Sequence, residues 1–180
     1  MPTKTILYQL AARTELKKGI DTLAKSVTST LGPKGRNVVL GKKIGTPPII
    51  NDGVTIAKEI YLNDHLENTG IFLIRQAALQ TNKVAGDGTT TSTVLAYAII
   101  KEGIRNVAAG ANPIILKRGI EKATELLIKK ITINSRCVTH VEDLKNVALI
   151  ASGNNRNVHL LIGNAYDKIG RNSLLSVEEG

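Results

Sequence analysis

Apolar residues recur at helical spacing along most of the chain. Residues 9 to 30 predict an amphipathic helix, whose apolar positions are Leu16, Ile20, Leu23, Ala24, Val27 and Leu31. We expect it to end at "LGPKG", because Gly32 tolerates unusual backbone angles and Pro33 cannot continue a helix. A second helix is expected after Asn63 or Asp64, either of which can cap it. Its apolar positions are Leu66, Ile71, Ile74, Ala78 and Val84.

Two short apolar runs between these helices indicate strands. "RNVVL" and "PPII" lie on either side of "GKKIGTP", which predicts a hairpin with a long loop. "NDG" at residues 51 to 53 indicates a tight turn. "VTIAKEIYL" then predicts another helix. The overall class is therefore mainly α, with short strands.

The second half of the chain continues the helical pattern. A helix following "GDGTTT" should reach about Ala109, and Asn112 should cap another helix that runs to about Ile133. Thr139 and Glu142 have capping-box spacing for a helix over 140–151. "VHLLIGNAYDKIG" predicts a helix and "SLLSV" a strand, after which the sequence stops. A final strand without a partner favours a truncated chain.

Composition narrows the class of protein. The 180 residues are 42% hydrophobic but only 3% aromatic, which predicts an aliphatic core in one domain, or one domain and part of another. A single cysteine, Cys137, excludes an intrachain disulfide and a Cys-rich zinc site. His65, His140 and His159 lack metal-ligand spacing. No apolar run approaches the ~20 residues that span a bilayer.

The net charge of +9 makes nucleic-acid binding a rival function. Lys and Arg are nevertheless spread along the chain, in "ELKKG", "GKKIG", "LKRG" and "IKKI", without a block of five. Aromatic side chains on which bases could stack are almost absent. A solvated basic surface is the favoured interpretation.

The stretch "GDGTTT", Gly86 to Thr91, is the main candidate for ligand chemistry. The first N–H groups of a helix have no internal partners and favour phosphate. Gly86 and Gly88 permit close approach of the backbone, and Thr89, Thr90 and Thr91 add hydroxyls. Asp87 would repel phosphate unless Mg²⁺ took oxygen ligands from both, so we interpret it as a metal ligand. The alternative is a capped helix start, with Asp87 or Thr89 as N-cap.

Two further loops are weaker candidates. "TLGPKG" could wrap a base or sugar, with Lys34 or Arg36 near phosphate, although most such loops are only turns. Asp52 could orient a water molecule or a second cation, although an acid in a tight turn usually bonds its own backbone. The chain lacks G-x-x-x-x-G-K-[ST], and "GDGTTT" does not complete G-x-G-x-x-G.

Four motifs together resemble one family. "VTSTLGPKGRNVVL", "NDGVTIAKEI", "AGDGTTTSTVLAYAII" and "AAGANPIILKRGIEKA" are similar, in order and spacing, to the amino-terminal part of group I chaperonins of the GroEL type. The resemblance covers nearly the whole chain and weakens after about residue 135. It implies an equatorial-domain segment over 1–135, with a helical ATP-binding fold and ring contacts. Residues 136–180 would begin a small α+β intermediate, or hinge, domain.

The resemblance also implies site residues and partners. Thr30, Leu31, Gly32 and Pro33 would line the nucleotide site. Asp87, Gly88, Thr89, Thr90 and Thr91 would hold the phosphates of ATP, with Asp87 on Mg²⁺. Asp52 would help place the water that attacks the terminal phosphate. Related subunits in a ring, unfolded client proteins and a co-chaperonin are the implied partners.

The sequence departs from the family in several places. Asn51 stands where some members have Lys, and "IASGNNRNVH" lacks acids expected in the hinge. Family chains are several times longer, so the resemblance implies that the apical domain and the main water-activating aspartate lie outside this sequence, which is either a fragment or a truncated gene product. A non-hydrolysing nucleotide-binding remnant is therefore the alternative function. The wording of the motifs and the use of Ile, Asn and Lys favour a plastid-encoded protein, with bacterial cytoplasm as the alternative.

Overall fold

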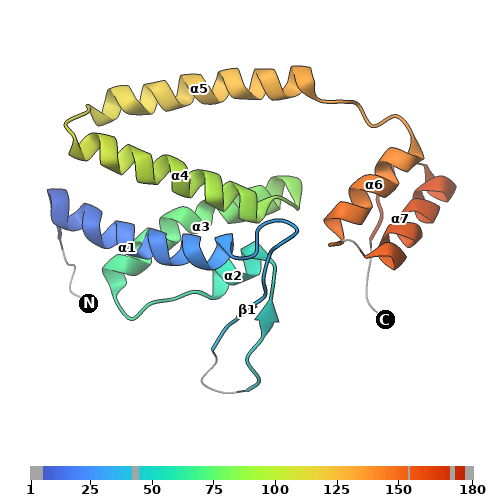
Figure 1. Ribbon diagram of the computed structural model, residues 1–180, viewed down its shortest axis with the longest axis horizontal. Helices are drawn as coiled ribbons and strands as arrows, with labels where there is room; N and C mark the ends of the chain where they lie inside the picture. The colour runs from blue at the N-terminus through green and yellow to red at the C-terminus, as the bar shows by residue number, and fades with distance from the viewer. Residues whose placement is uncertain (1–5, 42–44, 154, 171–172, 177–180) are drawn as a thin grey trace. The chain divides into compact units, whose positions relative to one another are not determined.

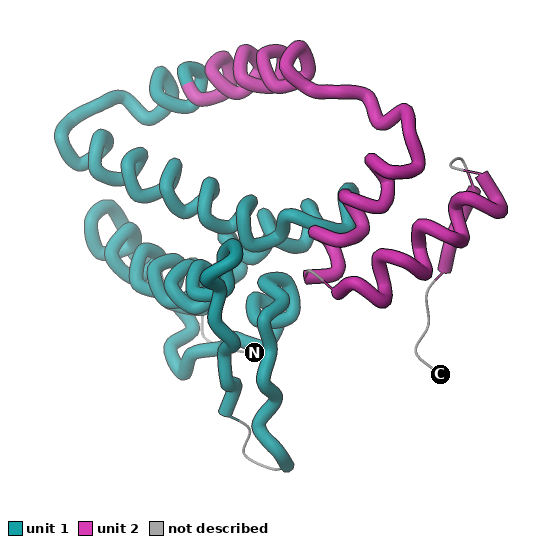
Figure 2. The backbone as a smooth tube through the Cα atoms, turned by 45° about the vertical axis from the view of Figure 1, so that its right-hand side comes forward, with its two compact units in different colours: residues 1–119 teal, residues 120–180 magenta. Residues whose placement is uncertain are grey.

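The computed structural model describes residues 6–41, 45–153, 155–170 and 173–176. Within these ranges the chain is mainly helical, as the pattern predicts (Figure 1). The elements in order are α1 (Gln9–Thr28), β1 (Val38–Val39), β2 (Ile49–Ile50), α2 (Gly53–Glu59), α3 (His65–Ala85), α4 (Thr89–Ala108), α5 (Pro113–Asn134), α6 (Val141–Ala151) and α7 (Arg156–Ile169). The chain divides into two compact units, Met1–Gly119 and Ile120–Gly180 (Figure 2). The proposed domain boundary near residue 135 stays a prediction.

The core of the first unit lies where α1, α2 and α3 meet. It is aliphatic, as the low aromatic content predicts. Its buried side chains are Ile20, Leu23, Ala24, Val27, Val54, Ile56, Ala57, Ile71, Ile74 and Ala78. The expected apolar positions of α1 and α3 are therefore largely correct. Two were wrong: Leu31 lies beyond the end of α1 and is exposed, and Val84 is exposed near the end of α3.

Two glycines let α1 and α3 approach each other closely. A Cβ on Gly19 would collide with the backbone carbonyl of Glu67, and a Cβ on Gly70 with the carbonyl of Leu16. Both obstacles are backbone atoms, which cannot rotate away as the end of a side chain can. The absence of side chains at Gly19 and Gly70 therefore sets the distance between the two helices.

The expected hairpin is present, and it is short. β1 and β2 pair antiparallel, with Val38 opposite Ile50 and Val39 opposite Ile49. The predicted turn "GKKIGTP" lies partly outside the described residues, at 42–44. Asp64, rather than Asn63, caps α3 by accepting hydrogen bonds from the N–H groups of Leu66 and Glu67 at 2.7 and 3.3 Å.

In the second unit α6 and α7 pack together. Lys145 joins them through an ion pair with Asp167, at 3.5 Å, and its aliphatic stem lies against Gly163. The predicted Thr139–Glu142 capping box was displaced by one residue: His140 is the N-cap, and the Asp143 carboxylate accepts from its N–H at 3.3 Å.

The remaining helix and strand predictions for this unit need adjustment. α7 begins two residues earlier than predicted, because Asn155 caps it through the N–H groups of Asn157 and Val158. The predicted strand is absent over 173–176, and Val177 lies outside the described residues. The described part of this unit is thus helical and shows no α+β character.

Candidate functional site

The start of α4 is built on two left-handed glycines. Gly86 has φ 72° and ends α3, and Gly88 has φ 80° and is the N-cap of α4. Gly88 occupies the N-cap position, and no side chain caps α4 there. The alternative in which Asp87 or Thr89 is the N-cap was therefore wrong. The first intrahelical bond runs from Ser92 N–H to Gly88 C=O at 2.9 Å. The backbone N–H groups of Thr89, Thr90 and Thr91 precede this bond and therefore have no acceptor within the helix.

The three threonines of the motif are not equivalent. Thr89 is buried, Thr90 is half-buried and Thr91 is exposed. The hydroxyls of Ser92 and Thr93 both donate to the Thr89 carbonyl, at 2.9 and 2.8 Å. Thr89 therefore packs at the edge of the core, and the more accessible hydroxyls belong to Thr90 and Thr91.

Segments far apart in the sequence meet at Thr90. The hydroxyl oxygens of Thr30 and Thr90 lie 3.4 Å apart. On the other side, a Cβ on Gly53 would collide with the Thr90 hydroxyl and would lie 3.2 Å from the Thr90 nitrogen. The end of α1 and the starts of α2 and α4 are thus in direct contact, so one residue from each predicted loop lies at one place.

The other predicted residues lie around this contact. Leu31, Gly32 and Pro33 are exposed on a turn that Gly35 N–H closes onto the Gly32 carbonyl at 2.9 Å. Lys34 and Arg36 are exposed nearby in sequence. Asp87 is exposed, and its carboxylate accepts from the N–H of Gly88 at 2.6 Å.

Asp52 is an N-cap as well as a candidate catalytic group. Its carboxylate accepts from the N–H of Thr55 at 2.9 Å and from the N–H of Val54 at 3.4 Å. It also accepts from the Thr55 hydroxyl at 2.5 Å. Sequence reasoning missed Thr55, although a hydroxyl residue three positions after a capping acid is a visible signal.

Replacing Asp52 tests its role as the N-cap of α2. We expect Asp52→Ala to lower the free energy of unfolding by about 1 kcal/mol, and Asp52→Asn to change it little, because Asn caps as well as Asp. Asp64→Ala is the matched control, since Asp64 caps α3 with nearly the same backbone angles. Urea denaturation followed by circular dichroism measures all three. An Asp52→Asn protein as unstable as Asp52→Ala would contradict the capping role.

The residues present fit a cation that is held jointly by the protein and a bound phosphate, rather than one enclosed by protein ligands. Among the described residues, no cluster of three or more His, Cys, Asp or Glu side chains could hold a metal ion. An exposed carboxylate beside an uncapped helix start instead suits a cation whose remaining ligands are phosphate and water oxygens.

The shifted pKa values of the first unit lie away from this contact. Burial, and then the neighbouring Asp21 carboxylate, raise the pKa of Tyr97. A hydrogen bond from Lys17 to Asp21, at 2.9 Å, raises the pKa of Lys17. These groups link α1 with α4 and belong to packing. No helix in the described ranges is long and apolar enough to cross a bilayer.

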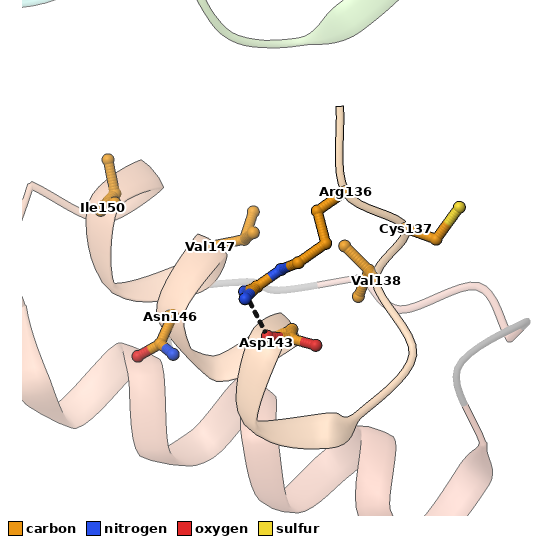
Figure 3. A pocket seen from close by; sticks show the side chains of 7 residues that line it. All are labelled: Arg136, Cys137, Val138, Asp143, Asn146, Val147 and Ile150. Atoms are coloured by element: carbon orange, nitrogen blue, oxygen red, sulfur yellow. Dashed lines mark hydrogen bonds and ion pairs between the residues drawn. The ribbon is translucent and has the colours of Figure 1, made fainter. Parts of the chain in front are cut away.

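A surface recess in the second unit contains none of the predicted site residues. It lies between the segment 136–138 and α6, and the Arg136 guanidinium pairs there with the Asp143 carboxylate at 2.9 Å (Figure 3). Cys137 lines it as a free, exposed thiol. This ion pair fixes the entry to α6, next to its N-cap.

Comparison with known proteins agrees with the fold. The chaperonin gp146 from the bacteriophage EL 2 (Pseudomonas aeruginosa), solved in the presence of ATP-BeFx, is 26% identical with a TM-score of 0.79, over 93% of this chain and 30% of that one. A group III chaperonin in the open state is also 26% identical, with a TM-score of 0.74, over 87% of this chain and 31% of the other. This chain therefore spans about a third of the length of these relatives. Residues 23–171 match the TCP-1/cpn60 chaperonin family, and the chain belongs to that family.

Proposed function

We propose that this chain is the nucleotide-binding, amino-terminal part of a group I chaperonin subunit. One observation carries the proposal: Thr30, Gly53 and Thr90 meet beside a helix start that no side chain caps in the described structure. Such a helix start supplies oriented N–H groups and partial positive charge to a phosphate. The family and the gp146 structure, solved in the presence of ATP-BeFx, support nucleotide as the ligand.

Each part of the site has a defined task in this proposal. Thr89, Thr90 and Thr91 donate backbone N–H groups, and Thr90 and Thr91 also hydroxyls, to the phosphates of ATP. Asp87 holds Mg²⁺, which supplies charge neutralisation when bound. The turn from Thr30 to Pro33 contacts the base or sugar, and Asp52 orients the water for hydrolysis.

The wider biology is part of the same proposal. Subunits of this family would assemble into a ring through the segment 1–135 and use ATP to fold client proteins with a co-chaperonin. The segment 136–180 would be the beginning of the hinge domain. Gly153, in the turn that precedes α7, and Gly170, which ends α7, both have positive φ angles that suit a hinge. Plastid is the proposed compartment, with bacterial cytoplasm as the alternative.

Titration with Mg-ATP tests the proposal directly. We expect Asp87→Ala to raise the Kd for Mg-ATP at least about tenfold, a cost of about 1.4 kcal/mol. Affinity for ATP in EDTA should change little, because the lost contact is to the cation. Asp64→Ala, which removes an exposed carboxylate at the N-cap of α3, is the binding control. Equal Mg-ATP affinity in the Asp87→Ala protein and the parent would remove Asp87 from the site.

Measurements on the parent chain distinguish this proposal from two alternative functions. Binding of Mg-ATP without phosphate release identifies the non-hydrolysing remnant. Salt-sensitive binding of DNA without affinity for ATP identifies a nucleic-acid-binding protein, for which the net charge of +9 is the supporting observation.

A further inference from the structure

The two aspartate caps of the first unit are not held alike. Asp52 and Asp64 both precede a helix, with φ −81° for each and ψ 121° and 124°. Each accepts from the N–H groups two and three residues further on. Asp52 has a third donor, the Thr55 hydroxyl, where α3 has Glu67, which has no hydroxyl.

This third donor makes the two oxygens of Asp52 different. Oδ2 accepts both the N–H and the hydroxyl of Thr55, at 2.9 and 2.5 Å. Oδ1 has only the long contact from the Val54 N–H, at 3.4 Å. Oδ1 therefore keeps acceptor capacity for a further partner, whereas Oδ2 is committed to the helix start.

Asp52 lies next to the contact between α2 and the start of α4, so its Oδ1 atom is close in sequence to the proposed phosphate site. Gly53, the next residue, lies against Thr90 at the start of α4. Asp52 itself is exposed. An exposed carboxylate on a single pair of backbone bonds would sample several rotamers, and a hydroxyl donor at Oδ2 restricts it to one.

We propose that Thr55 is a positioning residue, whose hydroxyl holds Asp52 by Oδ2 so that Oδ1 is presented to the water that attacks the terminal phosphate. This inference rests on the proposed function, and it deepens that function by one residue. Thr55 touches neither nucleotide nor water. It acts by keeping the water-placing carboxylate in one orientation.

Thr55→Val and Thr55→Ser test the inference in the whole chain. Val keeps the shape and removes the hydroxyl, and Ser restores the hydroxyl. We expect Thr55→Val to slow single-turnover hydrolysis of radiolabelled ATP about tenfold, with the Kd for Mg-ATP unchanged. Thr55→Ser should return the rate to near that of the parent. Thr69→Val, which removes a hydroxyl bonded to the His65 carbonyl at 3.1 Å in α3, should leave the rate unchanged.

A second readout does not depend on nucleotide. Three-bond NMR couplings of Asp52 should report one χ1 rotamer in the parent and in Thr55→Ser, and averaging in Thr55→Val, with Asp64 unchanged throughout. A single Asp52 rotamer in Thr55→Val overturns the inference. Averaging of Asp52 with an unaltered hydrolysis rate overturns it as well.

The two proposals can fail separately. A parent that does not bind Mg-ATP defeats the proposed function. If the parent binds Mg-ATP and releases no phosphate, hydrolysis alone is refuted and the coupling measurement decides the role of Thr55. Averaging in Thr55→Val with recovery in Thr55→Ser then supports the positioning of Asp52 by Thr55, whereas the presentation of Oδ1 to an attacking water is refuted together with hydrolysis.

Discussion

Gly70→Ala is expected to destabilise the first unit by about 1–2 kcal/mol, although alanine is the better helix former. The new methyl group would collide with the backbone carbonyl of Leu16 in α1. Overpacking of this kind costs about 1–3 kcal/mol. The gain of about 1 kcal/mol from helix propensity offsets only part of it, because the obstacle is a backbone carbonyl and the two helices must separate to make room.

Gly103→Ala is the matched control, with the opposite expected sign. Gly103 is also inside a helix, α4, and a Cβ there meets only the Leu116 Cδ2 atom, at an ordinary 4.0 Å. We expect this variant to gain up to about 1 kcal/mol. Urea denaturation of both variants measures the difference. If the two substitutions changed stability alike, the helix spacing would not depend on Gly70.

Helix positions in this chain could be predicted from periodicity, because burial follows it closely. Ile20, Leu23 and Val27 of α1 are buried as their spacing predicts. Periodicity does not say what covers an apolar face: α5 has a helical pattern but no buried residue in the described structure. Nor does it reveal how close two helices come, which depends here on glycines in both partners.

Helix ends were harder to predict than helix interiors. His140, rather than Thr139, caps α6, since Asp143 is the acid that reaches back to the cap. A difference of one residue changes no hydrophobic pattern, so only local hydrogen bonding decides it.

The burial of Arg75, in the middle of α3, was also not predictable from the sequence, because a charged side chain is ordinarily exposed. Arg75 is buried between the rings of Tyr61 and Phe72 and donates to the Ile60 carbonyl at 2.6 Å.

The candidate site was predicted as three separate loops, and the sequence could not show how they join. The contact that joins them runs through Thr90, which touches Thr30 on one side and Gly53 on the other. Gly53 has an ordinary role in the sequence, as the last residue of a tight turn. Its importance depends on Thr90, which is 37 positions further along the chain (90 − 53). No local sequence pattern contains that information.

Gly53→Ala is therefore expected to weaken Mg-ATP binding more than any substitution at the exposed turn 31–33. The added methyl group would occupy the place of the Thr90 hydroxyl and press on the Thr90 nitrogen at 3.2 Å. Either α2 moves away from α4 or Thr90 rotates, and both changes disturb the donors offered to phosphate. We expect the Kd for Mg-ATP to rise about 10- to 100-fold, or about 1.4–2.7 kcal/mol.

The controls for Gly53→Ala separate the site from the fold. Gly41→Ala places a methyl group in open space in the same unit and should bind like the parent. Circular dichroism of Gly53→Ala should keep the helical signal, because the core residues of α1 and α3 are untouched. Isothermal titration with Mg-ATP measures the affinities. Parent-like affinity in Gly53→Ala would mean that nucleotide does not use the contact between α2 and α4, and Asp52 would then lose its proposed place beside the terminal phosphate.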